Sequence, residues 1–332
     1  MAALSDLRAG TAGGSAPRIV DLRLVRANQL APVLTEEADA WRQELDWDFE
    51  GSAALVRRFL DMQALSGFCL VAGAGPVGYA YVVSESNKGL IGDFYIAREY
   101  STLDNELILL GAVVDAMTRS PAVRRIESQL MMLRWVRRDT LPHGEYACVV
   151  PRCFMRLDLT ALGRAGPLPP RRDIRHVTFD SWSERRQDEA AALIPVAYRG
   201  HVDSDINDQY RSPAGARRFL ANIIQYPGCG TFFQPASFMA LDNANGRLCG
   251  MCLSSLVAYD VGHITQVCVV PAFKGKGCGY ELMRRSLEAL IIAGCRAASL
   301  TVTAANTEAI ALYERLGFRT VKEFFACVWE GF

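Results

Sequence analysis

The chain has 332 residues, of which 50% are hydrophobic and 22% are charged. This composition is typical of globular proteins and excludes a largely disordered chain, and the length is sufficient for two domains. The 36 basic and 36 acidic residues give a formal net charge of zero, so no overall field favours nucleic acid or an anionic membrane as a partner. No apolar run approaches the ~18 residues that are needed to span a bilayer.

The N-terminal segment, residues 1–17, is rich in glycine and alanine and lacks the apolar stretch of a secretory signal. We expect it to be disordered. The ten cysteines lie mostly within apolar stretches and show neither the spacing of a disulfide framework nor that of a zinc site. They predict buried, reduced thiols in a cytoplasmic protein without a bound metal ion.

In the first half of the chain, two short apolar runs, residues 68–72 and 77–82, predict a β-hairpin. Residues 93–100 follow, and a helix is expected after them over residues 107–117. The segment between them, residues 101–106, has no glycine and carries two carboxylates. Such a segment opposes the binding of an anion at the start of the helix.

Residues 163–173 are rich in proline and glycine and have no hydrophobic period. This pattern predicts a semi-rigid linker between two domains of similar length, residues 18–162 and 174–332.

The second half begins with an unusually polar segment over residues 198–210, in which Asp203, Asp205 and Asp208 alternate with amide side chains. A cationic ligand fits this density of hydrogen-bond acceptors, and a solvated loop between helices is the alternative. The candidate substrate-binding residues of this segment are Asp203, Asp205, Asn207 and Tyr210.

The hairpin of the first half is then repeated by the apolar runs 238–241 and 248–253. Residues 93–100 of the first half occupy the place of residues 266–273 in the second. One order of elements therefore occurs twice, with a repeat of about half the chain.

The most specific motif is a glycine-rich turn between an apolar strand and an amphipathic helix. Residues 269–279 read VVPAFKGKGCG, and the helix follows over residues 280–290. Glycines allow successive backbone N–H groups to point at one anion, and the helix adds the positive end of its dipole. Lys274 and Lys276 supply counter-charge for a phosphate group. The glycine spacing fits neither the Walker motif nor the dinucleotide fingerprint.

One strand further on, the sequence continues with Asn306, Ala309, the pair Leu312-Tyr313 and the triplet Leu316-Gly317-Phe318. Together with the glycine-rich turn, this pattern resembles the signature of the GNAT acetyltransferases over residues 262–332. Lys274 departs from the pattern, since the family more often has Arg or Gln at that position. The resemblance implies an α/β (α+β) fold of two tandem GNAT-like domains, each a mostly antiparallel mixed sheet flanked by helices, with a degenerate first copy.

The resemblance also implies an N-acetyltransferase that transfers the acetyl group of acetyl-CoA to a primary amine by direct attack in a ternary complex. The amine belongs to a small molecule or a peptide. The strand backbone of Val267, Cys268 and Val269 matches the positions that hold the acetyl-pantetheine arm. The remaining candidate cofactor-binding residues are Lys274, Gly275, Lys276, Gly277, Cys278, Gly279 and Asn306. For Asn306, a helix cap alone is the alternative.

Two residues match catalytic positions of the family. Tyr313 stands where a tyrosine hydroxyl protonates the leaving thiolate of CoA. His263 stands where the family often has a glutamate that takes the proton of the attacking amine, and a histidine with a pKa near ~6.5 is competent for this. A buried structural histidine and a water relay are the alternatives.

A different class of function also fits the sequence, because one half has lost its glycine-rich turn and the glutamate is missing. That alternative is a non-catalytic acyl-CoA-binding sensor or scaffold. The first half is expected either to wall part of the acceptor site or to be purely structural. The expected partners are acetyl-CoA and an amine, without nucleic acid or membrane, and a homodimer is left open.

Overall fold

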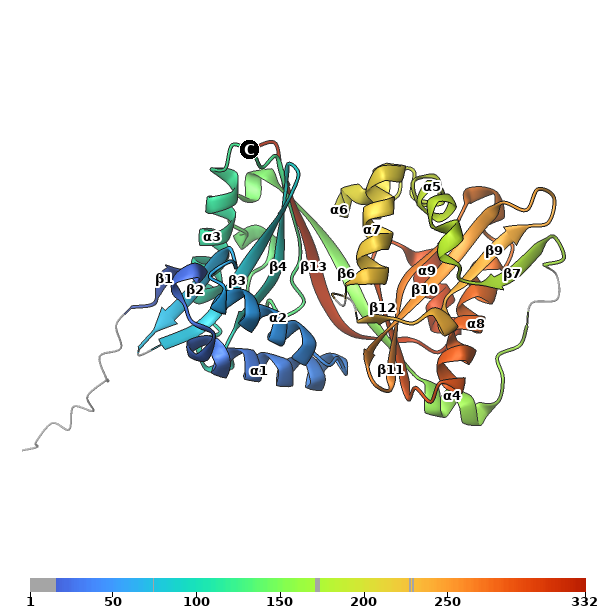
Figure 1. The fold of residues 1–332 in the computed structure, drawn as a ribbon, viewed down its shortest axis with the longest axis horizontal. Coiled ribbons are helices and arrows are strands. Elements are labelled where there is room, and N and C mark those ends of the chain that lie inside the picture. Colours follow the sequence, from blue (N-terminus) through green and yellow to red (C-terminus); the bar gives the residue numbers. More distant parts are fainter. Residues whose placement is uncertain (1–15, 74, 171–173, 227, 229) are drawn as a thin grey trace, which may run out of the picture.

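The computed structural model describes residues 16–73, 75–170, 174–226, 228 and 230–332. Most of the segment that we expected to be disordered, residues 1–15, lies outside these described residues, as do residues 171–173 of the expected linker. The described chain forms two lobes that are joined by long central strands (Figure 1). None of its helices combines the length and the apolar character required of a membrane span.

The first half contributes three α-helices and six strands among the described residues. They are β1 (Arg18–Asp21), α1 (Ala27–Leu45), α2 (Glu50–Asp61), β2 (Gly67–Ala72), β3 (Gly75–Glu85), β4 (Lys88–Ile96), α3 (Leu103–Thr118), β5 (Arg125–Gln129) and β6 (Ala147–Asp158). The hairpin and the helix that the sequence predicted correspond to β2–β3 and α3, and both are confirmed.

The second half repeats this order. Its elements are α4 (Leu159–Ala165), β7 (Val177–Ser181), α5 (Gln187–Ala197), α6 (Asp203–Ile206), α7 (Pro213–Gln225), β8 (Thr231–Phe232), β9 (Phe238–Asp242), β10 (Leu248–Ala258), β11 (Val261–Val269), α8 (Cys278–Ile292), β12 (Ala297–Thr303), α9 (Thr307–Arg315) and β13 (Arg319–Glu330). The second predicted hairpin is β9–β10, and the helix after the glycine-rich turn is α8.

The strands form one continuous sheet in the order β1-β2-β3-β4-β5-β13-β6-β12-β11-β10-β9-β7, and β8 pairs with β10 at its side. In the described chain, the pairs β4–β5 and β11–β12 are parallel and the other pairs are antiparallel. The mostly antiparallel mixed sheet that the sequence predicted is therefore present.

The two halves exchange their last strands at the centre of this sheet. β13 lies between β5 and β6 of the first half, and β6 lies between β13 and β12 of the second half. β6 and β13 also pair with each other over most of their length, and they cross between the lobes in Figure 1. Each half-sheet is thus completed by the other half. The division at residues 163–173 stays a prediction, and α4 occupies the first three residues of that segment.

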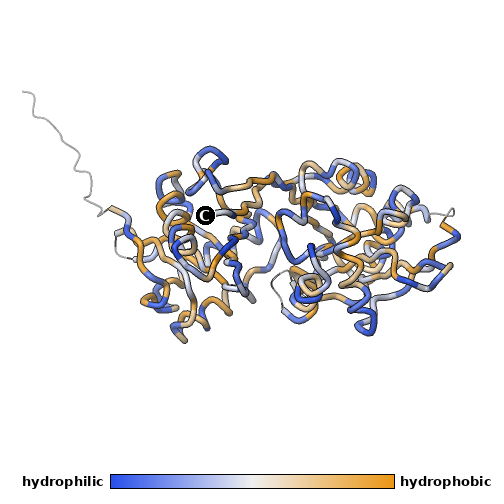
Figure 2. Tube along the Cα trace, turned by 90° about the horizontal axis from the view of Figure 1, so that it is seen from above, coloured by the Kyte–Doolittle hydropathy of each residue, from blue (hydrophilic) through white to orange (hydrophobic). Residues whose placement is uncertain are grey.

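Helices cover both faces of each half-sheet because successive strand residues point to opposite faces. On β2, Cys69 packs with α1 and α2, whereas Leu70 packs with α3. On β10, Met251 packs with α5 and α7, whereas Cys252 packs with α8. Strands that are buried on both faces read as continuous apolar runs. Hydrophobic segments accordingly run through the interior of both lobes, with hydrophilic loops at the periphery (Figure 2).

The register makes the two halves comparable position by position. A one-residue irregularity interrupts the pairing of β3 with β4 at Gly92 and that of β10 with β11 at Thr265. Immediately after it, Asp93 in the first half takes the place of Gln266 in the second. The correspondence between residues 93–100 and 266–273 is therefore confirmed.

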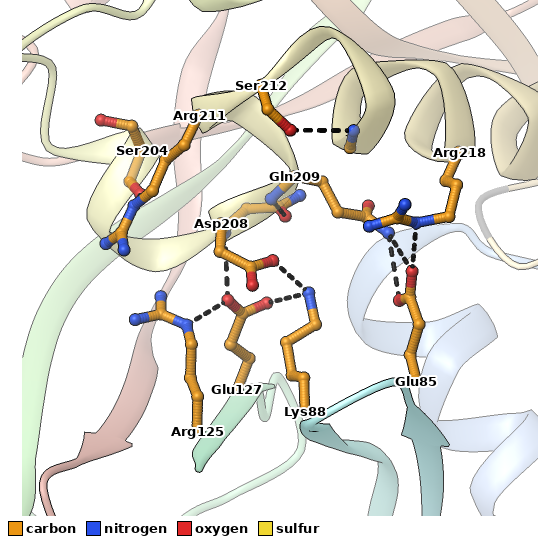
Figure 3. Close-up of polar contacts among 12 residues, drawn as sticks. Glu85, Lys88, Arg125, Glu127, Ser204, Asp208, Gln209, Arg211, Ser212 and Arg218 are labelled. Carbon is orange, nitrogen blue, oxygen red and sulfur yellow. Dashed lines mark hydrogen bonds and ion pairs between the residues drawn. The ribbon is translucent and has the colours of Figure 1, made fainter. Parts of the chain in front are cut away.

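A buried polar network joins the first half to the segment that contains α6 and α7 (Figure 3). The Lys88 ammonium on β4 lies 3.1 Å from the Glu127 carboxylate and 2.5 Å from that of Asp208. Arg125 donates to the other oxygen of Glu127 at 2.6 Å. Beside this group, Glu85 accepts from Gln209 and Arg218. These contacts fix the polar segment of the second half against the first half.

Candidate active site

The parallel strands β11 and β12 separate at the middle of the second half-sheet. They pair from Val261–Ala297 to Ile264–Leu300 and no further, whereas β11 continues to Val269. On the side that faces β12, the backbone groups beyond Ile264 are therefore free of ladder hydrogen bonds in the described structure. Val267, Cys268 and Val269 lie on this part of β11, where the sequence predicted the acetyl-pantetheine arm.

The glycine-rich turn follows at the end of β11. Gly275 and Gly277 have φ values of 72° and 82°, a region that side chains other than glycine rarely adopt. Gly277 is the N-cap of α8 and provides no side-chain hydrogen bond, so the first N–H groups of α8 have no capping side chain. Their geometry fits an anion such as the pyrophosphate of CoA.

The other residues of this turn differ in how they contribute to it. Lys276 lies 5.5 Å from the centre of the Phe273 ring. The Cys278 side chain is buried, so only its backbone N–H faces the turn. A Cβ on Gly279 would meet nothing closer than Leu312, at 3.7 Å. A side chain could therefore be accommodated at position 279, and steric crowding does not require a glycine there.

A cavity of about 360 Å³ opens beside the separated strands and is lined by both halves. The second half contributes Tyr198, Asp203, Asn207, Tyr210, His263, Gln266, Val267, Asn306 and Tyr313, among others. The first half contributes the aromatic side chains of Trp41, Trp47, Phe49 and Tyr81, together with Asp93. Sequence reasoning missed all five of these first-half residues, because no local motif marks them.

Two tyrosines hold Gln266 in place on β11. Its amide nitrogen donates to the Tyr198 hydroxyl at 2.8 Å, and its carbonyl oxygen accepts from the Tyr210 hydroxyl at 3.0 Å. The two tyrosine rings lie 4.5 Å apart. Gln266 thus orients both rings at the cavity, and Tyr198 is a site residue that the sequence analysis did not single out.

The predicted acceptor segment lies only partly at the cavity. Asp203 and Asn207 line it together with Tyr210. Asp203 also hydrogen-bonds to Thr303 and lies close enough to Tyr313 for its charge to help raise the pKa of that tyrosine. Asp205 does not line the cavity, and its side chain is 69% exposed and contacts Arg211. Of the two aspartates on α6, only Asp203 therefore lies at the cavity.

His263 is buried between aromatic rings. Its ring centre lies 5.0 Å from Trp47 and 6.2 Å from Phe154, and its Nδ1 is hydrogen-bonded to the Ser299 hydroxyl at 2.8 Å. Burial lowers the pKa of His263 to about 4. The side chain is therefore neutral at pH 7 and is a weak acceptor for the proton of an ammonium group.

Tyr313 and Asn306 also line the cavity beside the separated strands. Burial raises the pKa of Tyr313, so its phenol carries a proton at neutral pH and can donate it. Asn306 caps α9 by accepting from the Ala309 N–H at 3.3 Å, which confirms the predicted cap. Burial also raises the pKa of the Cys268 thiol to about 12, which makes this thiol a poor nucleophile.

Known structures resemble this fold over nearly its whole length. A GCN5-related N-acetyltransferase from Sphaerobacter thermophilus superposes with a TM-score of 0.61 at 19% identity and covers 95% of both chains. A tandem GNAT protein from the clavulanic acid biosynthesis pathway has a TM-score of 0.58 at 13% identity and covers 95% of this chain and 98% of that one. The described chain therefore has the tandem GNAT fold.

Similarity to GNAT proteins is also found at the level of sequence, in the second half of the chain. Residues 202–318 match the model of the Acetyltransferase (GNAT) family, so the chain contains a domain of that family. N-alpha-acetyltransferase MAK3 from Arabidopsis thaliana is 34% identical over 64 residues, which are 19% of this chain and 34% of that protein. Mycothiol acetyltransferase from Mycolicibacterium gilvum is 29% identical over 167 residues, which are 46% and 49% of the two chains. The chain spans 34% to 59% of the length of the curated relatives that it matches.

Proposed function

We propose that this protein is an acetyl-CoA-dependent N-acetyltransferase whose chemistry takes place in the second half. The observation that carries the proposal is the separation of β11 and β12 beside the uncapped start of α8, at the edge of a cavity. In this proposal the free backbone of Val267 to Val269 binds the acetyl-pantetheine arm. Lys274, Lys276 and the N–H groups of the glycine-rich turn bind the pyrophosphate. Asn306 contacts the cofactor beside its role as a cap.

The acceptor is a primary amine that enters from the cavity and attacks the thioester directly. Binding both molecules at once supplies orientation, and free N–H groups of β11 stabilise the oxyanion. The C–N bond forms as the C–S bond breaks, and Tyr313 donates a proton to the thiolate that leaves. Cys268 takes no covalent part, because its buried thiol stays protonated.

The proton that the attacking amine loses needs an acceptor other than a histidine with its ordinary pKa. Since His263 has a pKa of about 4, we propose that water removes the proton and that His263 orients this water rather than keeping the proton. Asp203 and the tyrosines around Gln266 form the wall against which the amine is placed. The first half closes the opposite wall with aromatic side chains.

The decisive experiment is a calorimetric titration with acetyl-CoA and CoA, followed by a thiol-release assay over a panel of primary amines. We expect binding at one site, and for Tyr313→Phe we expect retained acetyl-CoA affinity with a kcat lowered about 10- to 100-fold. Tyr259→Phe, at a tyrosine that is 91% exposed, is the matched control. Binding of acetyl-CoA without transfer to any amine would favour the sensor or scaffold instead.

A further inference from the structure

The first-half side of the cavity holds two buried carboxyl groups that have no cationic neighbour in the described structure. Asp93 on β4 is 9% exposed, and Glu37 on α1 is fully buried. Besides each other, they contact the Tyr79 hydroxyl, the Trp41 indole N–H and the backbone N–H of Phe94. None of these groups carries a positive charge.

The hydrogen bonds show how many protons this pair carries. The Tyr79 hydroxyl lies 2.7 Å from Glu37 Oε2 and 2.9 Å from Asp93 Oδ2. A hydroxyl donates one proton, so one of the two contacts requires a proton on a carboxyl group. Burial raises the pKa of Glu37 well above its usual range and that of Asp93 to about 6. The geometry thus requires one proton on the pair, and the upward pKa shift of Glu37, caused by burial and by the nearby Asp93, favours Glu37 as the protonated member and Asp93 as the charged one.

Asp93 faces a wall of aromatic rings in the cavity. Tyr81 is its cross-strand neighbour, and Trp41 stacks on Phe49 with ring centres 5.2 Å apart. Trp47 packs against Trp41 at 5.5 Å. Aromatic faces attract cations, and a desolvated carboxylate without a cationic partner is costly to the folded protein. A cation bound here gains from both features.

The aromatic wall also connects Asp93 with the reacting end of the cavity. Trp41 contacts the carboxyl pair, and Trp47 contacts His263, which lies on β11 shortly before Val267. The cation Arg152 lines the same cavity, but its guanidinium donates to Thr301 on β12, which belongs to the second half. The two indole rings, which pack against each other, therefore connect the surroundings of His263 to the carboxyl pair.

We infer that the acceptor is an elongated molecule with two cationic groups, one an amine that is acetylated beside Tyr313 and the other an ammonium or guanidinium group bound by Asp93. This inference rests on the proposed function. It assigns the first half a binding role, with Trp41, Trp47 and Tyr81 as the surface along which the molecule lies.

The test compares two primary alkylamines of equal length and shape, one ending in a trimethylammonium group and the other in a tert-butyl group. For the wild type we expect kcat/KM to be at least about 10-fold higher for the charged amine. Asp93→Asn should abolish this preference. Asp104→Asn, which removes an exposed carboxylate of the same half, should retain it. Equal kcat/KM for both amines in the wild type, or an undiminished preference in Asp93→Asn, overturns the inference.

The outcomes separate this inference from the proposed function. Equal transfer to both amines overturns the inference alone. If no amine of a broad panel is acetylated, the proposed function fails, and calorimetric binding of the trimethylammonium amine then decides. An affinity that falls at least about 10-fold in Asp93→Asn supports the cation site, whereas an unchanged affinity overturns it. The comparison of the two amines in the wild type needs no variant and is independent of whether Asp93→Asn folds.

Discussion

The turns that lead into α3 and α8 occupy the same place in the two halves, but the two helices begin differently. α3 is capped by its own Thr102, whose hydroxyl accepts from the Asn105 N–H at 3.2 Å. α8 begins at Gly277, which has no side chain to offer. A duplicated fold can thus lose an anion site without a change of fold, because a capping side chain occupies the helix start and satisfies one of the N–H groups that a phosphate would otherwise bind.

The first-half turn is also covered by another segment of the chain. The Glu106 carboxylate accepts from three consecutive backbone N–H groups, those of Arg134, Trp135 and Val136. The Trp135 indole N–H donates to the Ser101 carbonyl at 2.8 Å. Three N–H groups that could together donate to an anion therefore already donate to a carboxylate of the protein. The turn of the first half is therefore filled by contacts within the protein, whereas the turn of the second half is open to a ligand.

The largest effect is expected at Lys88, the first residue of β4. The first half has a buried charge at this position, whereas the corresponding residue of β11 is Val261. Lys88→Met leaves the buried Glu127 and the partly exposed Asp208 without their ammonium partner, and should lower the free energy of unfolding by about 3–5 kcal/mol. Chemical denaturation measures this loss.

Arg119→Met serves as the control, because the Arg119–Asp115 pair is exposed and should change stability by less than ~0.5 kcal/mol. A similar small loss for Lys88→Met would show that the network in Figure 3 does not hold the halves together.

Reversing the charge of the open turn tests the other side of the comparison. Lys274→Glu/Lys276→Glu should weaken acetyl-CoA binding about 100-fold, or about 2.7 kcal/mol, because both side chains would repel the pyrophosphate. Calorimetry gives the dissociation constant. Arg185→Glu/Arg247→Glu, at exposed positions of the same half, changes the net charge equally and should bind normally. Retained affinity in the turn variant would place the cofactor elsewhere.

A pH-dependent effect distinguishes Asp93 from its counterpart Gln266. The folded protein binds the Asp93 proton more tightly than the unfolded chain does, so this group makes stability fall as the pH rises from about 4 to about 6. Asp93→Asn should therefore raise the free energy of unfolding at pH 7.5 by about 1–3 kcal/mol, and the gain should disappear near pH 4. Glu37, Tyr79 and Tyr81 are the titratable groups that face Asp93.

Thermal melts at both pH values measure this difference in the absence of ligand. A variant that is less stable than the wild type at pH 7.5 would show that the Asp93 charge is already compensated. Asp104→Asn, at an exposed carboxylate, should show no such change with pH.

The smallest effect concerns the cap that closes the first-half turn. Thr102→Ala leaves the Asn105 N–H without its hydroxyl acceptor and should cost about 1 kcal/mol. Denaturant midpoints measure the change, and Thr118→Ala, at the end of the same helix, is the control. No loss in Thr102→Ala would mean that water caps α3 equally well.

The sequence was sufficient for the features that depend on local pattern. The hairpins, α3, α8 and the cap at Asn306 follow from apolar runs, glycine positions and capping chemistry, each within a short stretch. The cavity walls were not predictable in this way, because Glu37 and Asp93 lie on different elements and come together, with Tyr79 beside them, only in the folded chain. The inward direction of Asp203 and the outward direction of Asp205 depend likewise on how α6 is held by the first half.

The exchange of β6 and β13 was also beyond local reasoning, since either strand has the pattern of a last strand in its own half. Its consequence concerns the order of synthesis. β13 leaves the ribosome after every other strand of the sheet, yet β5 of the first half has no second neighbour until β13 arrives. The N-terminal lobe therefore cannot finish its sheet until the second half of the chain has been synthesised, and its exposed strand edge stays unpaired until the C-terminal lobe delivers the missing strand.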